Sequence, residues 1–172
     1  MNYKGVVIDA GHGGTDGGAV GNGIVEKELN LKISKYIDGV SLNGFSLAQG
    51  DYSTAYGERT IALGKGSYVC GTDSVAIGDY SRAEGLKSTA FGLNSHAEGW
   101  NTLSEGQSSH AEGSETQSIG EGSHAEGVAT KALGTHSHAE GGRTEARGNN
   151  SHAEGELSKA YGNGSHAEGC ST

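Results

Sequence analysis

Six pairs of histidine and glutamate recur at fixed spacing in the C-terminal part of the chain. Each pair lies in a Ser-His-Ala-Glu-Gly segment, and successive segments begin 14 residues apart, from Ser95 to Ser165. Imidazole and carboxylate groups at this spacing fit a metal or polyanion site, or a structural ladder of hydrogen bonds and charge pairs. We favour the structural ladder because the pair repeats unchanged. Its members are His96/Glu98, His110/Glu112, His124/Glu126, His138/Glu140, His152/Glu154 and His166/Glu168.

A second candidate site lies near the N-terminus. Residues 5–10 read as a buried strand that leads into a glycine-rich turn containing His12, and Glu26 precedes a segment with apolar residues at helical spacing. A strand, a loop histidine and a glutamate at a helix start suit a zinc site. No histidine occurs between His12 and His96. Catalysis of hydrolysis at a zinc site needs more than two protein ligands and also a general base. This segment offers neither, so we predict no catalytic residue.

Glycine occupies every seventh position from Gly50 to Gly169. An unbroken period over this length predicts a repeat architecture. The heptad reads Ser/Thr-x-Ala-x-Gly-x-x, whose alternation predicts a five-residue strand with Ser, Ala and Gly on one face. Glycine and the two variable residues that follow it, such as Asn94 or Asn163-Gly164, predict the turn between strands.

The full repeat is 14 residues, because alternate heptads differ. It predicts an all-β fold, a parallel β-roll solenoid with two short strands per coil and about nine coils, stacked at about 4.8 Å. A core of Ser, Ala and Gly buries little apolar area, so a second face should be buried by self-association around a three-fold axis. The uniform His–Glu face suits this axis. Apolar pairs in the other strand series, Ile61/Leu63 and Val75/Ile77, leave the opposite assignment open.

The heptad, above all Ser74-Val75-Ala76-Ile77-Gly78, resembles the head repeats of trimeric autotransporter adhesins. The Ser-His-Ala-Glu-Gly variant is similar to repeats in phage and prophage tail-associated proteins. The resemblance implies a left-handed parallel β-roll that forms a homotrimer. It also implies a structural or adhesin-like shaft or binding segment of a phage or bacterial surface protein.

Residues Ile8–Gly14, Asp16–Ala19, Glu26-Lys27 and Asn30-Leu31 resemble the opening of zinc-dependent N-acetylmuramoyl-L-alanine amidases. The resemblance implies that His12 and Glu26 are two of three zinc ligands. The family's second histidine ligand and catalytic glutamate find no match. We therefore predict a truncated amidase-like strand–helix segment at residues 1–37, a junction at 38–45 and the heptad-repeat β-roll at 46–172. A peptidoglycan amidase with an incomplete catalytic domain is the alternative function.

The composition narrows the range of partners. A formal net charge of -9 without a basic patch disfavours nucleic acid. No apolar run is long enough to insert into a membrane, and no signal peptide is recognisable.

We expect a homotrimer with a cell-surface or cell-wall glycan as ligand, in a phage virion or on the bacterial surface. No cofactor is expected beyond the zinc that the amidase resemblance implies. Stacked histidines predict that stability depends on pH in the histidine titration range.

Overall fold

The computed structural model describes residues 20–21, 24–25 and 45–171. The chain divides into two units, Met1–Asn43 and Gly44–Thr172. In the first unit, β1 (Val20–Gly21) pairs antiparallel with β2 (Ile24–Val25), a pair that the sequence pattern does not predict. His12, Glu26 and the strand and helix predicted beside them lie outside the described residues.

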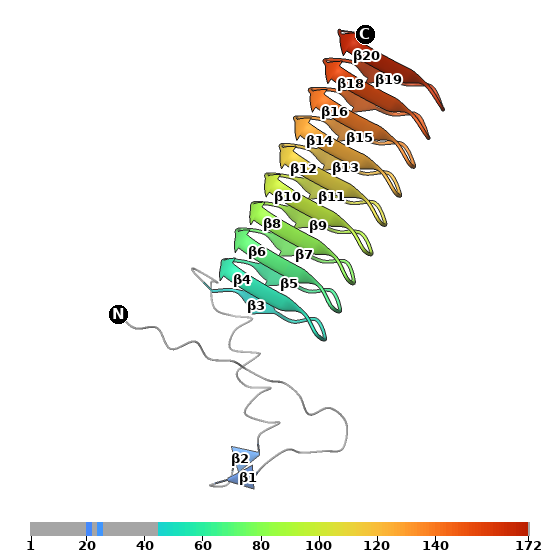
Figure 1. Cartoon of the computed structure of the whole chain (residues 1–172). Helices are drawn as coiled ribbons and strands as arrows, with labels where there is room; N and C mark the ends of the chain where they lie inside the picture. The colour runs from blue at the N-terminus through green and yellow to red at the C-terminus, as the bar shows by residue number, and fades with distance from the viewer. Residues whose placement is uncertain (1–19, 22–23, 26–44, 172) are drawn as a thin grey trace. The chain divides into compact units, whose positions relative to one another are not determined.

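Residues 45–171 form a β-solenoid in which long and short strands alternate (Figure 1). Each strand pairs in parallel with the strand one coil away, so that His96 lies opposite His110 and Leu103 opposite Gln117. Two nine-stranded sheets result, one of long and one of short strands. The predicted all-β parallel solenoid, with two strands per 14-residue coil and about nine coils, is therefore confirmed.

The long-strand sheet consists of β4 (Thr54–Glu58), β6 (Tyr68–Thr72), β8 (Arg82–Leu86), β10 (His96–Trp100), β12 (His110–Ser114), β14 (His124–Val128), β16 (His138–Gly142), β18 (His152–Glu156) and β20 (His166–Cys170). The short-strand sheet consists of β3 (Leu47–Ala48), β5 (Ile61–Ala62), β7 (Val75–Ala76), β9 (Thr89–Ala90), β11 (Leu103–Ser104), β13 (Gln117–Ser118), β15 (Lys131–Ala132), β17 (Glu145–Ala146) and β19 (Lys159–Ala160).

The two heptads of a coil fold differently, which corrects the prediction of one five-residue strand for both. In the long-strand heptad, Gly99 lies inside β10 with φ 115°. In the short-strand heptad, Gly106 instead begins a turn, in which the Ser109 amide donates to the Gly106 carbonyl at 3.2 Å. The short strands therefore end after two residues, because their glycine already belongs to the turn.

Each coil has two corners at which one residue adopts left-handed φ. One corner recurs from Tyr52 to Gly164 at 14-residue steps, with φ between 53° and 65°. The predicted turn positions Asn94 (φ 55°) and Gly164 (φ 65°) belong to it. Tyrosine, serine and histidine also occupy this corner, where the backbone amide donates to the preceding coil; the Asn94 amide donates to the Asp79 carbonyl at 2.9 Å. Stacking of coils thus holds a conformation that L-residues seldom adopt alone.

The space between the two sheets is filled by small side chains. From Ala62 to Ala160, the alanines of both strand series are almost completely buried, and Val69 is the largest fully buried side chain. Serine hydroxyls in this interior bond to the turns; the Ser109 Oγ donates to the Gly106 carbonyl at 2.6 Å. Where serine replaces alanine at Ser104, its Oγ pairs with the Ser109 Oγ, also at 2.6 Å. The predicted narrow core of Ser and Ala is confirmed, and it leaves both outer faces to be explained.

Candidate functional site

The structure brings all six predicted His–Glu pairs together on the outer face of the long-strand sheet. In each strand alanine points into the core, so that the residues on either side of it, histidine and glutamate, point outward. The parallel register then places each pair over the next, as His96 over His110 and Glu98 over Glu112. We call this column, with Glu84 at its head, the His–Glu ladder.

The imidazole rings of the ladder are stacked face to face. Ring centroids of successive histidines from His96 to His152 are 4.7–4.8 Å apart, with interplanar angles of 1–6°. The last ring, His166, lies edge-on to His152 at 4.9 Å. Each histidine therefore stacks on the equivalent histidine of the neighbouring coil, as the 14-residue repeat predicts.

The histidines also approach glutamates of two coils. The Nε2 atom of His96 lies 3.5 Å from Glu98 Oε2 in its own strand and 3.7 Å from Glu84 Oε2 in the preceding coil. His152 repeats this arrangement with Glu154 at 3.8 Å and Glu140 at 3.7 Å. The contact between coils was not predicted, because the sequence pairs each histidine only with the glutamate two residues later.

Glu84 belongs to the ladder although the motif misses it. Its strand reads Arg-Ala-Glu-Gly rather than His-Ala-Glu-Gly, and the register places Arg82 beneath His96 and Glu84 beneath Glu98. The Arg82 guanidinium donates to Glu84 Oε1 at 3.0 Å and lies 5.1 Å from the Tyr68 ring centroid. Counting back 14 residues from Glu98 would have found Glu84. The histidine column therefore begins at His96, because Arg82 occupies the equivalent position in the preceding coil.

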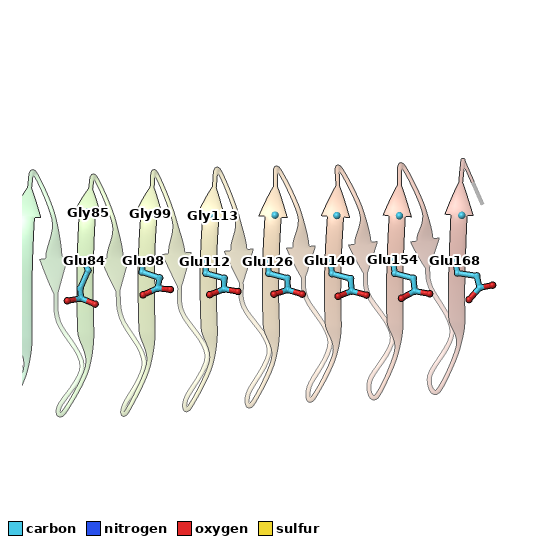
Figure 2. Close-up of a pocket in the computed structure, with 14 residues that line it drawn as sticks. Glu84, Gly85, Glu98, Gly99, Glu112, Gly113, Glu126, Glu140, Glu154 and Glu168 are labelled. Atoms are coloured by element: carbon cyan, nitrogen blue, oxygen red, sulfur yellow. The ribbon is translucent and has the colours of Figure 1, made fainter.

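A groove runs beside the ladder and is lined by its glutamates and by the glycine that follows each of them (Figure 2). The carboxylates form one row that runs across the strands, with one glutamate per strand at the same height in successive coils. The glutamate side chains from Glu84 to Glu154 are 26–40% exposed, so a ligand can reach the row of carboxylates from solvent. The groove is acidic, and its chemistry favours cations over anions.

Burial and neighbouring imidazoles lower the pKa of His110 and His138 below the usual histidine value. Burial is the larger cause; His96 and His124 add repulsion around His110, and His124 and His152 around His138. Glu112 and Glu126 oppose the shift at His110, and Glu140 and Glu126 oppose it at His138. In the sheet, the neutral form of the imidazole is thus favoured at these two positions.

We predict that acidification destabilises the solenoid. Unfolded histidine titrates near pH 6.5, and a lower pKa in the folded chain means that the unfolded chain binds protons first. The contribution of the neutral His110 and His138 imidazoles to stability is present above about pH 6.5. It is lost as pH falls through their pKa values in the folded chain. Thermal unfolding followed by circular dichroism should therefore give a lower Tm at about pH 5.5 than at about pH 7.5. The His110→Gln/His138→Gln variant should lose part of this difference; a Tm that rises on acidification would contradict the sign.

The outer face of the short-strand sheet has a different character. Two of its coils carry apolar residues at both outward positions, Ile61 with Leu63 in the coil of β5 and Val75 with Ile77 in the coil of β7. Leu63 is 39% exposed and Phe91 48% exposed in the single chain. In the coil of β17 both positions are charged, and Glu145 and Arg147 form an ion pair at 2.8 Å. The two outward positions are thus both apolar in the coils of β5 and β7, both charged in the coil of β17, and mixed in the other coils.

Two known families match different parts of this chain. The profile of the YadA head domain repeat matches residues 45–67 and 71–101, within the solenoid. The repeat is similar to the YadA head. The profile of N-acetylmuramoyl-L-alanine amidases matches residues 6–45. Both resemblances expected from the sequence are confirmed, and the 14-residue register continues unbroken from the YadA-matching coils into the Ser-His-Ala-Glu-Gly coils.

Three relatives match over short stretches. The protein YqiI of Bacillus subtilis is 62% identical over 34 residues, which are 20% of this chain and 16% of that protein. The N-acetylmuramoyl-L-alanine amidase LytC of Bacillus subtilis is 54% identical over 33 residues, 19% of this chain and 7% of LytC. The endolysin of Bacillus phage SPP1 is 47% identical over 43 residues, 25% of this chain and 16% of the endolysin. The chain thus spans a sixth or less of each relative's length.

These findings describe the two units separately. The second unit carries adhesin-like, YadA head-like β-solenoid repeats, and the amidase match is confined to a short N-terminal segment. The matches point to a cell-surface or phage context. Among the described residues, no helix is long and apolar enough to cross a membrane. Cys70 and Cys170 are both free thiols, so no disulfide joins the described coils.

Proposed function

We propose that the repeat region is a homotrimeric β-roll shaft of a phage or bacterial surface protein, which holds a ligand-binding surface away from the particle or cell. The apolar outer face of the short-strand sheet is the observation that carries this proposal. The resemblance to adhesin heads adds a left-handed coil and a cell-surface or cell-wall glycan as the ligand class.

The solenoid needs an additional apolar contact. Its interior buries alanine, serine and threonine with one valine, so little apolar area is removed from water per coil. The apolar residues of this face, which are densest in the coils of β5 and β7, supply the missing area when copies of the chain pack together. Parallel rods with one apolar side satisfy this need around a three-fold axis, where each chain contributes the same face.

Electrostatics favours the short-strand face as the one that turns to the proposed axis. Seven glutamates per chain, Glu84 to Glu168 at 14-residue steps, line the groove of the long-strand sheet. Bringing three such columns together would bury many like charges, at a cost that no cation on these columns offsets apart from Arg82. We therefore place the short-strand face at the axis and the His–Glu ladder on the outside. This choice reverses the sequence-based expectation, in which the uniform His–Glu face lies at the axis.

Light scattering on the purified chain tests the proposal. A trimer has three times the chain mass of 17.4 kDa, and this mass should be unchanged after treatment with a chelator. A monomer at micromolar concentration would contradict the shaft. A mass that falls when the chelator is added would instead assign the assembly to a metal.

The amidase match and the names of two relatives favour a second candidate function, zinc-dependent cleavage of peptidoglycan by the N-terminal segment. By resemblance, His12 and Glu26 would supply two zinc ligands, and both lie outside the described residues. Clearing of a suspension of Bacillus cell walls tests this function. Activity that His12→Gln and a chelator both abolish would support it, and cell walls left intact by the unmodified chain with added Zn²⁺ would contradict it.

A further inference from the structure

We propose that the His–Glu ladder binds a row of divalent transition-metal ions of the zinc class, one at each Glu-His-Glu triad of the long-strand sheet. These sites are separate from the one that the amidase resemblance places at His12 and Glu26. They use only residues of one chain's solenoid, so no second copy has to supply a ligand.

Each triad offers three ligand atoms from two adjacent coils. One is the histidine Nε2, and the other two are carboxylate oxygens from the same strand and from the preceding one. In Glu84–His96–Glu98 and the five triads that follow, the three atoms lie within 4.8 Å of one another. Three protein ligands of the nitrogen and oxygen type, with a water as the fourth, are the donor set of an open zinc site.

The spacings within the triads suit a metal better than direct hydrogen bonds. The nitrogen–oxygen distances are 3.3–3.9 Å, mostly too long for a hydrogen bond. Ligands about 2.0–2.1 Å from a tetrahedral ion are about 3.3–3.4 Å from each other. Small rotations of the flexible glutamate side chains close the remaining gap, because the carboxylates lie on an open face.

The histidine nitrogens supply an independent observation. The Nε2 atoms of His96, His110, His124, His138 and His152 are inaccessible to water and have no hydrogen-bond partner among the described residues. A buried polar atom without a partner is costly, and each of these faces carboxylates rather than a donor. A neutral imidazole directs a lone pair from Nε2 when Nδ1 carries the proton, and a cation held by the carboxylates would satisfy it.

The carboxylates are arranged to serve two neighbouring sites. Glu154 directs its Oε2 atom to His152 at 3.8 Å and its Oε1 atom to His166 at 3.9 Å. One carboxylate can therefore bridge two ions, one through each oxygen. Ions in adjacent triads would lie about one coil apart, roughly 4.8 Å, and would repel each other. We expect alternate triads to fill first and the intervening ones more weakly, so that binding shows two affinity classes.

The test uses Zn²⁺ alone and the full chain carrying His12→Gln, which removes the N-terminal candidate site. Equilibrium dialysis near pH 7.5 should show up to about six zinc ions per chain at saturation, one for each of the six triads. The added substitutions His110→Gln, His138→Gln and His166→Gln should reduce this number to about three. Added His136→Gln is the matched control, since His136 lies at a corner outside the ladder, and it should leave zinc uptake unchanged.

Three further measurements keep the result interpretable. Far-UV circular dichroism shows whether each variant retains its β-structure, and Glu112→Gln removes an oxygen ligand shared by two triads without altering any histidine. Co²⁺ in place of Zn²⁺ should give the visible absorption of a four-coordinate ion, which the ladder variants lose. Zinc uptake that is equal in the ladder variants and the control, or no binding below about 1 mM, would overturn the proposal.

Discussion

Replacing Gly113 by alanine should unfold the solenoid locally or prevent it from folding. Gly113 has φ 107°, a conformation that L-residues rarely adopt. A Cβ atom at this position would lie 2.2 Å from the carbonyl oxygen of Gly127 in the next coil. The carbonyl belongs to the backbone and cannot move without breaking the ladder of hydrogen bonds between coils. We expect a loss of more than about 4 kcal/mol in the free energy of unfolding, measured by urea denaturation.

Gly164→Asn is the matched control for this substitution. Gly164 also has a positive φ, 65°, but a Cβ atom added there would meet no other atom within 4 Å. Asn94 and Asn150 occupy the same corner in other coils with φ 55° and 56°. Stability should therefore change by less than about 1 kcal/mol. Similar losses for both variants would show that left-handed φ alone, rather than contact between coils, makes the seventh glycine necessary.

The heptad period predicted the fold because coil stacking imposes the same demand on every coil. A side chain at Gly50 or Gly57 would collide with the glycine backbone one coil later, 2.1 or 1.9 Å away. Only glycine lacks the Cβ atom that would collide. Glycine therefore recurs at every position where the backbones of two coils approach this closely. The small core follows in the same way, since Ser and Ala at fixed positions alternate with outward residues.

The sequence did not distinguish the roles of the two glycines in a coil. Gly99 and Gly106 occupy the same place in the heptad, yet the first lies in a strand and the second begins a turn. The difference depends on the closure of the coil, which a local pattern does not contain. For the same reason the contact of His96 with Glu84 was missed, because it joins residues in different coils. His12 and Glu26 lie outside the described residues, so the N-terminal metal site stays a prediction.

Placing two aspartates on the apolar face should dissociate the proposed trimer. Ile61 and Val75 lie opposite each other in β5 and β7, half-buried in the single chain and pointing away from the core. At a three-fold axis, Ile61→Asp/Val75→Asp would bring together six carboxylates with no cation to pair them. Each unpaired buried charge costs several kcal/mol, which exceeds what the remaining apolar contacts return. Light scattering should then give a mass near the 17.4 kDa of one chain.

A matched pair of substitutions on the long-strand sheet shows whether dissociation depends on where the two aspartates lie or only on the added negative charge. Leu86 and Val128 end β8 and β14 and are 40% and 55% exposed, and Glu58 and Glu156 occupy the same position in other coils. Leu86→Asp/Val128→Asp adds the same charge without touching the short-strand face, so the mass should remain three times that of one chain. If this control dissociates while Ile61→Asp/Val75→Asp stays assembled, the axis lies on the long-strand side. The His–Glu ladder would then be enclosed by its own copies, and metal binding would require the chains to separate first.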